Sequence, residues 1–188
     1  MKKFSAKEIL IPTISLFLIC SVVTLLLAVT NSVTAPKIAE LQIETENRTK
    51  AAVLSDAASF SDEKTITYNG AEYTYYEGYD NDKNIVGYVF TTSAKGYGGD
   101  IVTMVGIKVD GTVAGMDFLS ISETAGLGMN ADTDDFKNQF VGKSGEIGVN
   151  KNMSSDTEIQ ALTGATITSK AVTEAVNTAL NLFEEVNG

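Results

Sequence analysis

The first pattern along this chain is a long uninterrupted apolar run. No charged residue occurs between Ile9 and Pro36, and Leu10–Val29 consists mainly of Leu, Ile, Val, Phe and Ala. About 20 such residues allow a helix to cross the hydrocarbon of a membrane. We therefore expect a single retained transmembrane helix over residues 9–30. A cleaved signal peptide is the alternative, although the apolar core of a signal peptide is usually shorter than this run.

A segment rich in helix-forming residues follows the apolar run. Residues 37–58 predict a helix that leads away from the bilayer. We accordingly place a juxtamembrane helical segment at residues 31–60. Its candidate buried positions are Ile38, Leu41, Val53 and Leu54.

The second pattern, an alternation of apolar and polar residues, is typical of strands. Two hairpins are predicted, one over residues 65–76 and one over residues 101–120. Asn69-Gly70 and Asp110-Gly111 are the dipeptides expected at tight turns of this kind. A further strand is predicted at Ile85–Thr92.

The third pattern is helical and lies at the end of the chain. Apolar residues recur there at spacings of three and four, which indicates a helix with one buried face: Val172, Ala175, Val176, Ala179, Leu180 and Phe183. A short helix is also predicted at residues 134–141. The order of elements predicts an α+β fold, with an antiparallel sheet and flanking helices in an extracytoplasmic domain at residues 61–188.

Charge sets the expected orientation and excludes several functions. Lys2, Lys3 and Lys7 precede the apolar run, whereas only Lys37 follows closely, so residues 1–8 are expected to be cytoplasmic. The formal net charge of −10 argues against a nucleic-acid partner. There is no histidine and only one cysteine, Cys20, so His-based acid–base catalysis and Cys-rich zinc or iron–sulfur sites are excluded. We predict no metal site.

Three threonines stand where the C-terminal helix is predicted to begin. Thr163, Thr166 and Thr168 surround Gly164 and Ala165. Free N–H groups and the positive end of the helix dipole make such a place suitable for a phosphate. On these residues alone, ordinary helix capping by Thr or Ser is the favoured explanation.

Two loops rich in glycine separate predicted strands or follow them. Lys95-Gly96-Tyr97-Gly98-Gly99 would let the backbone approach a ligand, with the ring of Tyr97 as a stacking surface. Glu123–Gly128 places a carboxylate and a hydroxyl beside an apolar leucine. Taken alone, the first loop is better explained as a flexible hairpin connection, and the second could also be a plain surface loop.

Together these segments resemble the FMN-binding domain of the G subunit of the Rnf electron-transport complex, and of the related C subunit of the sodium-pumping quinone reductase. The single N-terminal membrane helix agrees with this resemblance. The matching stretches are Gly96–Gly99, Val105–Ile107 with Asp110-Gly111, Glu123–Gly128 and Thr163–Thr168. Two positions depart from the family pattern, since Ala125 stands where proline is frequent and Gln160 stands where an acidic residue is frequent.

The resemblance implies a cofactor and its attachment site. In this family FMN is bound covalently, through a phosphoester, to the last threonine of the Thr-Gly-Ala-Thr motif, which here is Thr166. The remaining residues of that motif that would shape the pocket are Thr163, Gly164, Ala165 and Thr168. The residues implied from the two glycine-containing loops are Lys95, Gly96, Tyr97 and Gly98, and Glu123, Thr124, Gly126, Leu127 and Gly128.

The resemblance also implies a role. It indicates a flavoprotein that carries electrons as one part of an ion-translocating ferredoxin:NAD+ oxidoreductase, a translocase of bacterial or archaeal cell membranes. The expected partners are the other membrane and iron–sulfur subunits, and a flavin transferase for maturation. The chain alone is not expected to perform a complete reaction. Alternatives are a stand-alone flavinylated carrier of another redox chain and an anchored binding module without redox activity.

Overall fold

The computed structural model describes residues 6–187 of the chain. The chain divides into two units, residues 1–44 and 45–188, and each is described by itself. Of the predicted cytoplasmic segment at residues 1–8, Lys2 and Lys3 lie outside the described residues.

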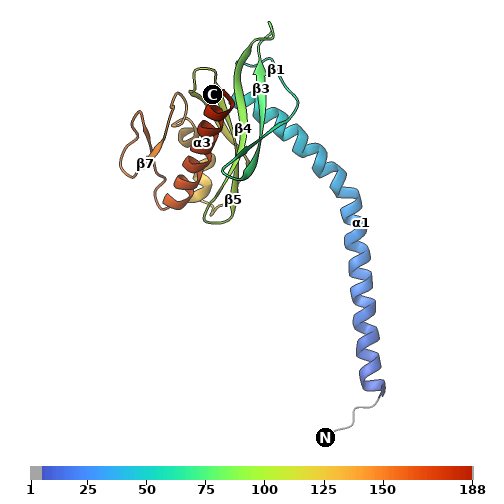
Figure 1. Cartoon of the computed structure of the whole chain (residues 1–188). Helices are drawn as coiled ribbons and strands as arrows, with labels where there is room; N and C mark the ends of the chain where they lie inside the picture. Colours follow the sequence, from blue (N-terminus) through green and yellow to red (C-terminus); the bar gives the residue numbers. More distant parts are fainter. Residues whose placement is uncertain (1–5, 188) are drawn as a thin grey trace. The chain divides into compact units, whose positions relative to one another are not determined.

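The first unit consists of most of helix α1 (Ala6–Val53) (Figure 1). Its apolar side chains are exposed along the helix, and the helix is long and apolar enough to cross a membrane. Thr13 donates its hydroxyl hydrogen to the carbonyl oxygen of Ile9 at 2.8 Å, so this polar side chain is satisfied within the helix.

Helix α1 does not stop where the predicted transmembrane segment ends. It continues through Pro36 and ends at Val53, and its last residues, 45–53, belong to the second unit. Residues 31–53 of the predicted juxtamembrane segment are thus helical, as expected, and are continuous with the predicted transmembrane segment. A proline removes one backbone donor, and the good helix formers that follow Pro36 continue the helix. Of the four predicted buried positions, Val53 and Leu54 are buried, whereas Ile38 and Leu41 are exposed.

The second unit contains a six-stranded antiparallel sheet with the order β1-β3-β4-β5-β6, and β2 pairs with the same strand, β3, as β1 does. Both predicted hairpins are present. Asn69 and Gly70, with φ values of 50° and 80°, form the turn between β2 and β3, and Gly111 has φ 82° between β5 and β6. The strands are β1 (Ser59–Phe60), β2 (Lys64–Tyr68), β3 (Ala71–Tyr79), β4 (Ile85–Lys95), β5 (Asp100–Lys108) and β6 (Val113–Ser120).

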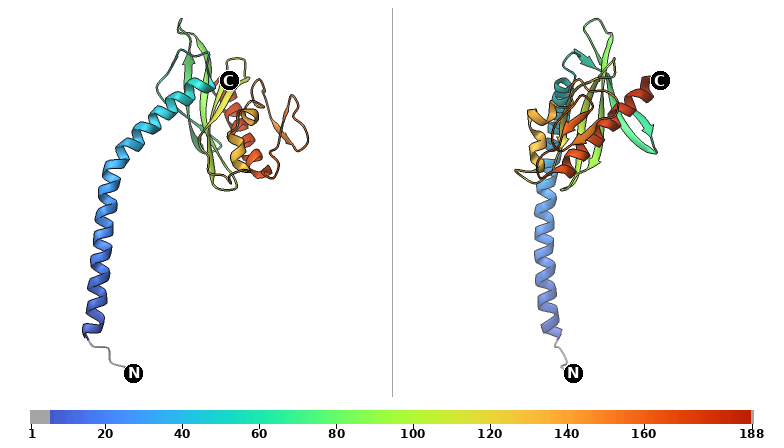
Figure 2. Two further views of the ribbon diagram at one scale, coloured as in Figure 1. Left: turned by 180° about the vertical axis from the view of Figure 1, so that it is seen from behind. Right: turned by 90° about the vertical axis from the view of Figure 1, so that its left-hand side faces the viewer.

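Helices and a second, smaller sheet complete this unit (Figure 2). The segment after β6 contains a short 3₁₀ helix, η1 (Gly128–Asp132), and helix α2 (Asp134–Lys137), which is shorter than the predicted helix at 134–141. A parallel pair, β7 (Gly148–Asn150) and β8 (Glu158–Gln160), was not predicted. Helix α3 (Thr166–Asn187) closes the fold.

The sheet has a hydrophobic core on each face. Helix α3 packs on one face of the sheet (Figure 1). Its predicted apolar stripe meets residues such as Phe90 and Val105 there. On the opposite face, Val53 and Leu54 pack against Val89. An α+β domain with an antiparallel sheet and flanking helices is confirmed.

Two glycines of the sheet make room for the side chain of Leu54. A methyl group placed on Gly78 would lie 2.5 Å from Leu54 Cδ2, and one on Gly87 would lie 2.9 Å from Leu54 Cδ1. Leu54 is completely buried. The slot between β3 and β4 therefore fixes the end of α1 against the sheet.

Candidate functional site

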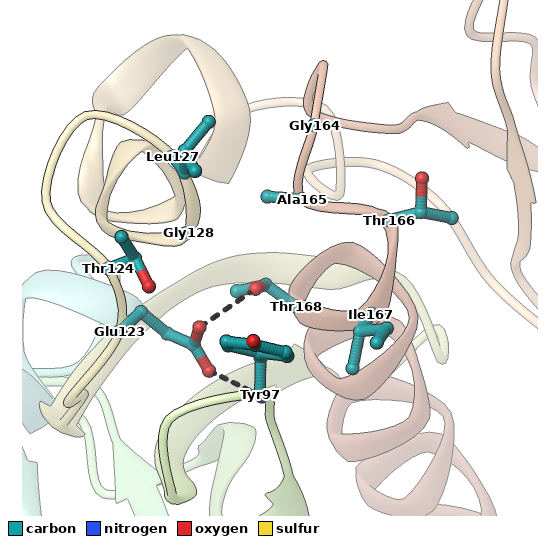
Figure 3. A pocket seen from close by; sticks show the side chains of 10 residues that line it. All are labelled: Tyr97, Glu123, Thr124, Leu127, Gly128, Gly164, Ala165, Thr166, Ile167 and Thr168. Carbon is teal, nitrogen blue, oxygen red and sulfur yellow. Dashed lines mark hydrogen bonds between the residues drawn. The ribbon is translucent and has the colours of Figure 1, made fainter.

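Three segments that are far apart in the sequence meet around one cavity of 540 Å³ (Figure 3). They are the turn between β4 and β5, the loop that follows β6, and the turn that leads into α3. The lining residues are Tyr97, Glu123, Thr124, Leu127, Gly128, Gly164, Ala165, Thr166, Ile167 and Thr168.

The carboxylate of Glu123 joins these segments. Its Oε1 accepts hydrogen bonds from the backbone N–H groups of Tyr97, at 2.8 Å, and Gly98, at 3.2 Å. Its Oε2 accepts a hydrogen bond from the hydroxyl of Thr168 at 3.1 Å. Figure 3 shows the carboxylate between the backbone of Tyr97 and the side chain of Thr168.

Gly96 and Gly128 make room for the carboxylate of Glu123, because neither carries a side chain. A methyl group on Gly96 would collide with Glu123 Oε1. One on Gly128 would lie 2.6 Å from Glu123 Oε2 and 2.8 Å from Thr168 Oγ1. The absence of a side chain at Gly96 thus lets the β4–β5 turn approach Glu123, and its absence at Gly128 lets the loop after β6 approach α3.

A buried serine fixes the turn before α3. The hydroxyl of Ser169 accepts a hydrogen bond from the N–H of Leu162 at 2.9 Å and donates to the carbonyl oxygen of Ala165 at 3.0 Å. Gly164 adopts φ 77°, a backbone conformation that residues with side chains rarely adopt. The turn thus has one defined shape.

Thr166 is the first residue of α3 and lies at the rim of the cavity. Within residues 6–187, its hydroxyl forms no hydrogen bond, and neither do the backbone N–H groups of Thr166, Ile167 and Thr168. These are the free donors of a helix N-terminus, and they favour an anion. The start of α3 therefore offers free donors for an anion beside Thr166.

Three large, mainly apolar side chains also line the cavity, beside the polar Glu123, Thr124 and Thr168. Tyr97, Leu127 and Ile167 come from three different segments and are 73%, 43% and 54% exposed. Exposed apolar groups that gather at a cavity favour the binding of a flat apolar ring. The cavity thus combines an apolar wall with anion-favouring donors.

A cationic side chain holds the loop after β6 against the sheet at some distance from this cavity. Lys137 forms ion pairs with Asp117 at 2.9 Å and with Asp132 at 3.2 Å. Burial lowers the pKa of Lys137, but its hydrogen bonds to the two carboxylates outweigh burial, and the net shift of the pKa is upward. Lys137 thereby ties η1 to β6.

The sequence matches two known families. The FMN-binding domain family matches residues 96–181, and the RnfG N-terminal region matches residues 1–53. Among curated proteins, the G subunit of the proton-translocating ferredoxin:NAD(+) oxidoreductase complex of Clostridium ljungdahlii is 37% identical over 94% of this chain and 92% of that protein. The G subunit of the Na(+)-translocating complex of Acetobacterium woodii is 36% identical over 92% of this chain and 90% of that protein. The chain belongs to the RnfG family.

Solved structures agree with membership of the RnfG family. The C subunit of the Na(+)-translocating NADH-quinone reductase of Parabacteroides distasonis superimposes with a TM-score of 0.51 at 27% identity, over 58% of this chain and 59% of that chain. NqrC of Shewanella oneidensis has a TM-score of 0.52 at 16% identity, over 71% of this chain and 74% of that chain, and shows the fold. The resemblance stated from the sequence is confirmed. Family membership and α1 together indicate a membrane location.

Most residues that the sequence singled out line the cavity of this RnfG family member, and five do not. Lys95 is the last residue of β4 and pairs with Asp100. Gly96 and Gly98 lie beside Glu123 instead of the cavity, and Gly126 adopts φ 76° in the loop. Thr163 lines a neighbouring pocket of 280 Å³ that shares Gly164 and Thr166 with the cavity.

One residue that lines the cavity, Ile167, was not among the site residues predicted from the sequence. It lies within the threonine motif, and its exposed apolar side chain breaks the pattern of a helix with one buried face. The sequence signal that could have identified Ile167 is an isolated apolar residue on the polar face of the first turn of α3.

Proposed function

We propose that this chain is the electron-carrying G subunit of an ion-translocating ferredoxin:NAD+ oxidoreductase, with FMN joined to Thr166 by a phosphoester. The proposal combines family membership with the position of Thr166. That position is the observation that carries it, because the Thr166 hydroxyl, which has no hydrogen-bond partner within the described residues, stands at the N-terminus of α3 among the residues that line the 540 Å³ cavity.

The donor set around Thr166 fits a phosphodiester. Such a group keeps one negative charge, and hydrogen bonds from N–H groups to an ionised oxygen are about twice as strong as bonds between neutral groups. The N–H groups of Ile167 and Thr168 are free within the described residues, and Gly164 brings no side chain to the approach.

The apolar wall fits the flavin ring system. Tyr97, Leu127 and Ile167 would hold the ring and exclude water from its faces, while Glu123 keeps the turn that bears Tyr97 in place. FMN supplies the one-electron chemistry when bound, and the protein contributes placement and electrostatic surroundings. A covalent link would prevent loss of the cofactor where free FMN is scarce, because noncovalent occupancy depends on ligand concentration.

The assembly that we propose follows from the relatives. Helix α1 would anchor the chain by a single crossing, with the N-terminus in the cytoplasm and residues 45–188 outside. The other membrane and iron–sulfur subunits of the complex would donate and accept the electrons, and coupling to ion transport would reside in the whole complex. A flavin transferase would form the phosphoester.

Mass spectrometry tests the attachment. The full chain is co-expressed with a flavin transferase, extracted in detergent, and measured intact and after proteolysis. We expect a mass gain of one FMN less one water, located on the peptide that contains Thr166, and flavin fluorescence on the denatured band. Thr166→Ala should remove both signals.

Thr178→Ala is the matched control, because it removes a hydroxyl from the same helix, α3, outside the threonine motif and outside the cavity. It should leave the mass gain in place. An unmodified wild-type chain in the presence of active transferase would refute covalent attachment, and so would an undiminished signal from Thr166→Ala.

A further inference from the structure

The carboxylate of Glu123 receives three hydrogen bonds from two segments that belong to different sides of the cavity. Two come from the β4–β5 turn, through the N–H groups of Tyr97 and Gly98, and one comes from Thr168 in the first turn of α3. Glu123 itself is on the third segment, the loop after β6. One side chain therefore connects all three walls.

We propose that Glu123 is a positioning residue that sets the separation of Tyr97 and the start of α3, and that its negative charge lowers the reduction potential of the flavin. This rests on the proposed function, because it concerns the same cavity. The two parts of the role have different atomic origins and are separable by substitution.

The positioning part follows from the hydrogen bonds. The ring of Tyr97 is 73% exposed, so packing does little to fix it, and its backbone is held by the bond to Glu123 at 2.8 Å. Thr168 is buried, and its hydroxyl donates to the same carboxylate. Without the carboxylate, the turn and the helix would lose their common acceptor.

The charge part follows from the location of the carboxylate. Glu123 lines the cavity, and a cation that pairs with it is absent among the ion pairs of residues 6–187. The neutral donors disperse its charge without cancelling it. A negative charge at the wall opposes the addition of an electron to a group in the cavity, and the opposition is large where water is excluded.

Two substitutions separate these parts. Glu123→Gln keeps an oxygen that can accept from Tyr97 and Gly98, and Thr168 can turn its hydroxyl to accept from the amide, but the charge is lost. Glu123→Ala loses both the acceptor and the charge. Glu174→Gln is the matched control, because Glu174 is an exposed residue of α3 outside the cavity.

Hydrogen exchange tests positioning without any need for flavin. In the full chain in detergent, carrying Thr166→Ala so that no flavin is attached, exchange of the Tyr97 and Gly98 amides should accelerate roughly tenfold or more in Glu123→Ala. This follows because a hydrogen bond to a charged group contributes about 1.5–3 kcal/mol. Glu123→Gln should stay close to the parent chain. Unchanged exchange in Glu123→Ala would overturn the positioning role.

The midpoint potential tests the charge. In flavinylated chains with Thr166 intact, Glu123→Gln should have a more positive potential than wild type, and Glu174→Gln should not. An unchanged or more negative potential in a fully flavinylated Glu123→Gln would overturn the charge role. Failure of wild type to become flavinylated would instead refute the proposed function, so the two failures are distinguishable.

Discussion

Shortening Leu54 should destabilise the folded unit that follows α1 strongly. Leu54 is completely buried, and its two terminal methyl groups lie over Gly78 and Gly87. Leu54→Ala leaves a cavity, because Gly78 and Gly87 have no side chains that could move into the vacated space. We expect a loss of about 3 kcal/mol, within the range of about 2–5 kcal/mol that is typical of such substitutions.

A second substitution should partly restore the stability. In wild type, Gly78→Ala would place a methyl group 2.5 Å from Leu54 Cδ2 and 3.0 Å from Ala57 Cβ, and overpacking of this kind costs roughly 1–3 kcal/mol. In the Leu54→Ala background the first of these clashes is absent and the methyl group fills the cavity. The double variant should therefore be more stable than the sum of the two losses predicts, by about 1–2 kcal/mol.

Gly87→Ala is the matched control for this cycle. Its methyl group would lie 2.5 Å from the backbone carbonyl oxygen of Ile107, and that clash remains whatever residue stands at position 54. Leu54→Ala should thus rescue Gly78→Ala to a greater extent than it rescues Gly87→Ala.

Tyrosine signals offer a suitable assay in the full chain. The chain has no tryptophan, and all seven tyrosines lie between residues 68 and 97, so near-ultraviolet circular dichroism reports on the sheet and not on the membrane helix. Urea titrations in detergent would give the free energies of unfolding. Two results would refute the conclusion that Leu54 packs in a slot formed by Gly78 and Gly87. One is an equal loss of unfolding free energy from Gly78→Ala in the wild-type and Leu54→Ala backgrounds, and the other is a loss below about 1 kcal/mol for Leu54→Ala.

Three further predictions concern other parts of the fold. The buried hydroxyls of Thr92 and Thr103 have no hydrogen-bond partner within the described residues, so Thr103→Val should stabilise the chain by about 0.5–1 kcal/mol in urea titrations, and a loss would contradict this. Gly164→Ala forces a methyl-bearing residue to φ 77° and should lower the free energy of unfolding by about 1 kcal/mol or more, as read from the same titrations. The hydrogen bond from Lys64 lowers the pKa of Glu77, so the stability that this carboxylate contributes is present above its ordinary pKa of 4.5 and is lost as the pH falls through the lowered value. Lys64→Met should flatten that acid-side decline in thermal unfolding measured against pH, and an unaltered decline would argue against the pair.

Local signals explain which elements could be predicted from the sequence. Asn69-Gly70 and Asp110-Gly111 determine their turns by their own backbone preferences, and the apolar stripe of α3 extends over several turns, so these elements were found. Strands β7 and β8 have three residues each, which is too short for alternation to be visible. Their pairing depends on contacts between residues that are distant in the sequence.

In the site, too, features with a local sequence signal could be predicted, whereas contacts between distant segments could not. Thr166 and its neighbours were predicted because the motif is contiguous and begins a helix. The bonds from Tyr97 and Thr168 to Glu123 could not be predicted, since they span 26 and 45 positions of the chain. The predicted helix over residues 37–58 extended too far, since α1 ends at Val53 and is followed by Ser55 and Asp56, which disfavour a helix interior.

The hydroxyl of Ser169 has a consequence for the energetics of ligand binding in the cavity. By bonding to Leu162 and Ala165 it immobilises the turn before α3 during folding, when the helix itself forms. Restricting a backbone residue costs roughly 1–2 kcal/mol of conformational entropy. That entropic penalty is met before any ligand arrives, so the turn is preorganised, and the affinity of the pocket is not reduced by the need to order it.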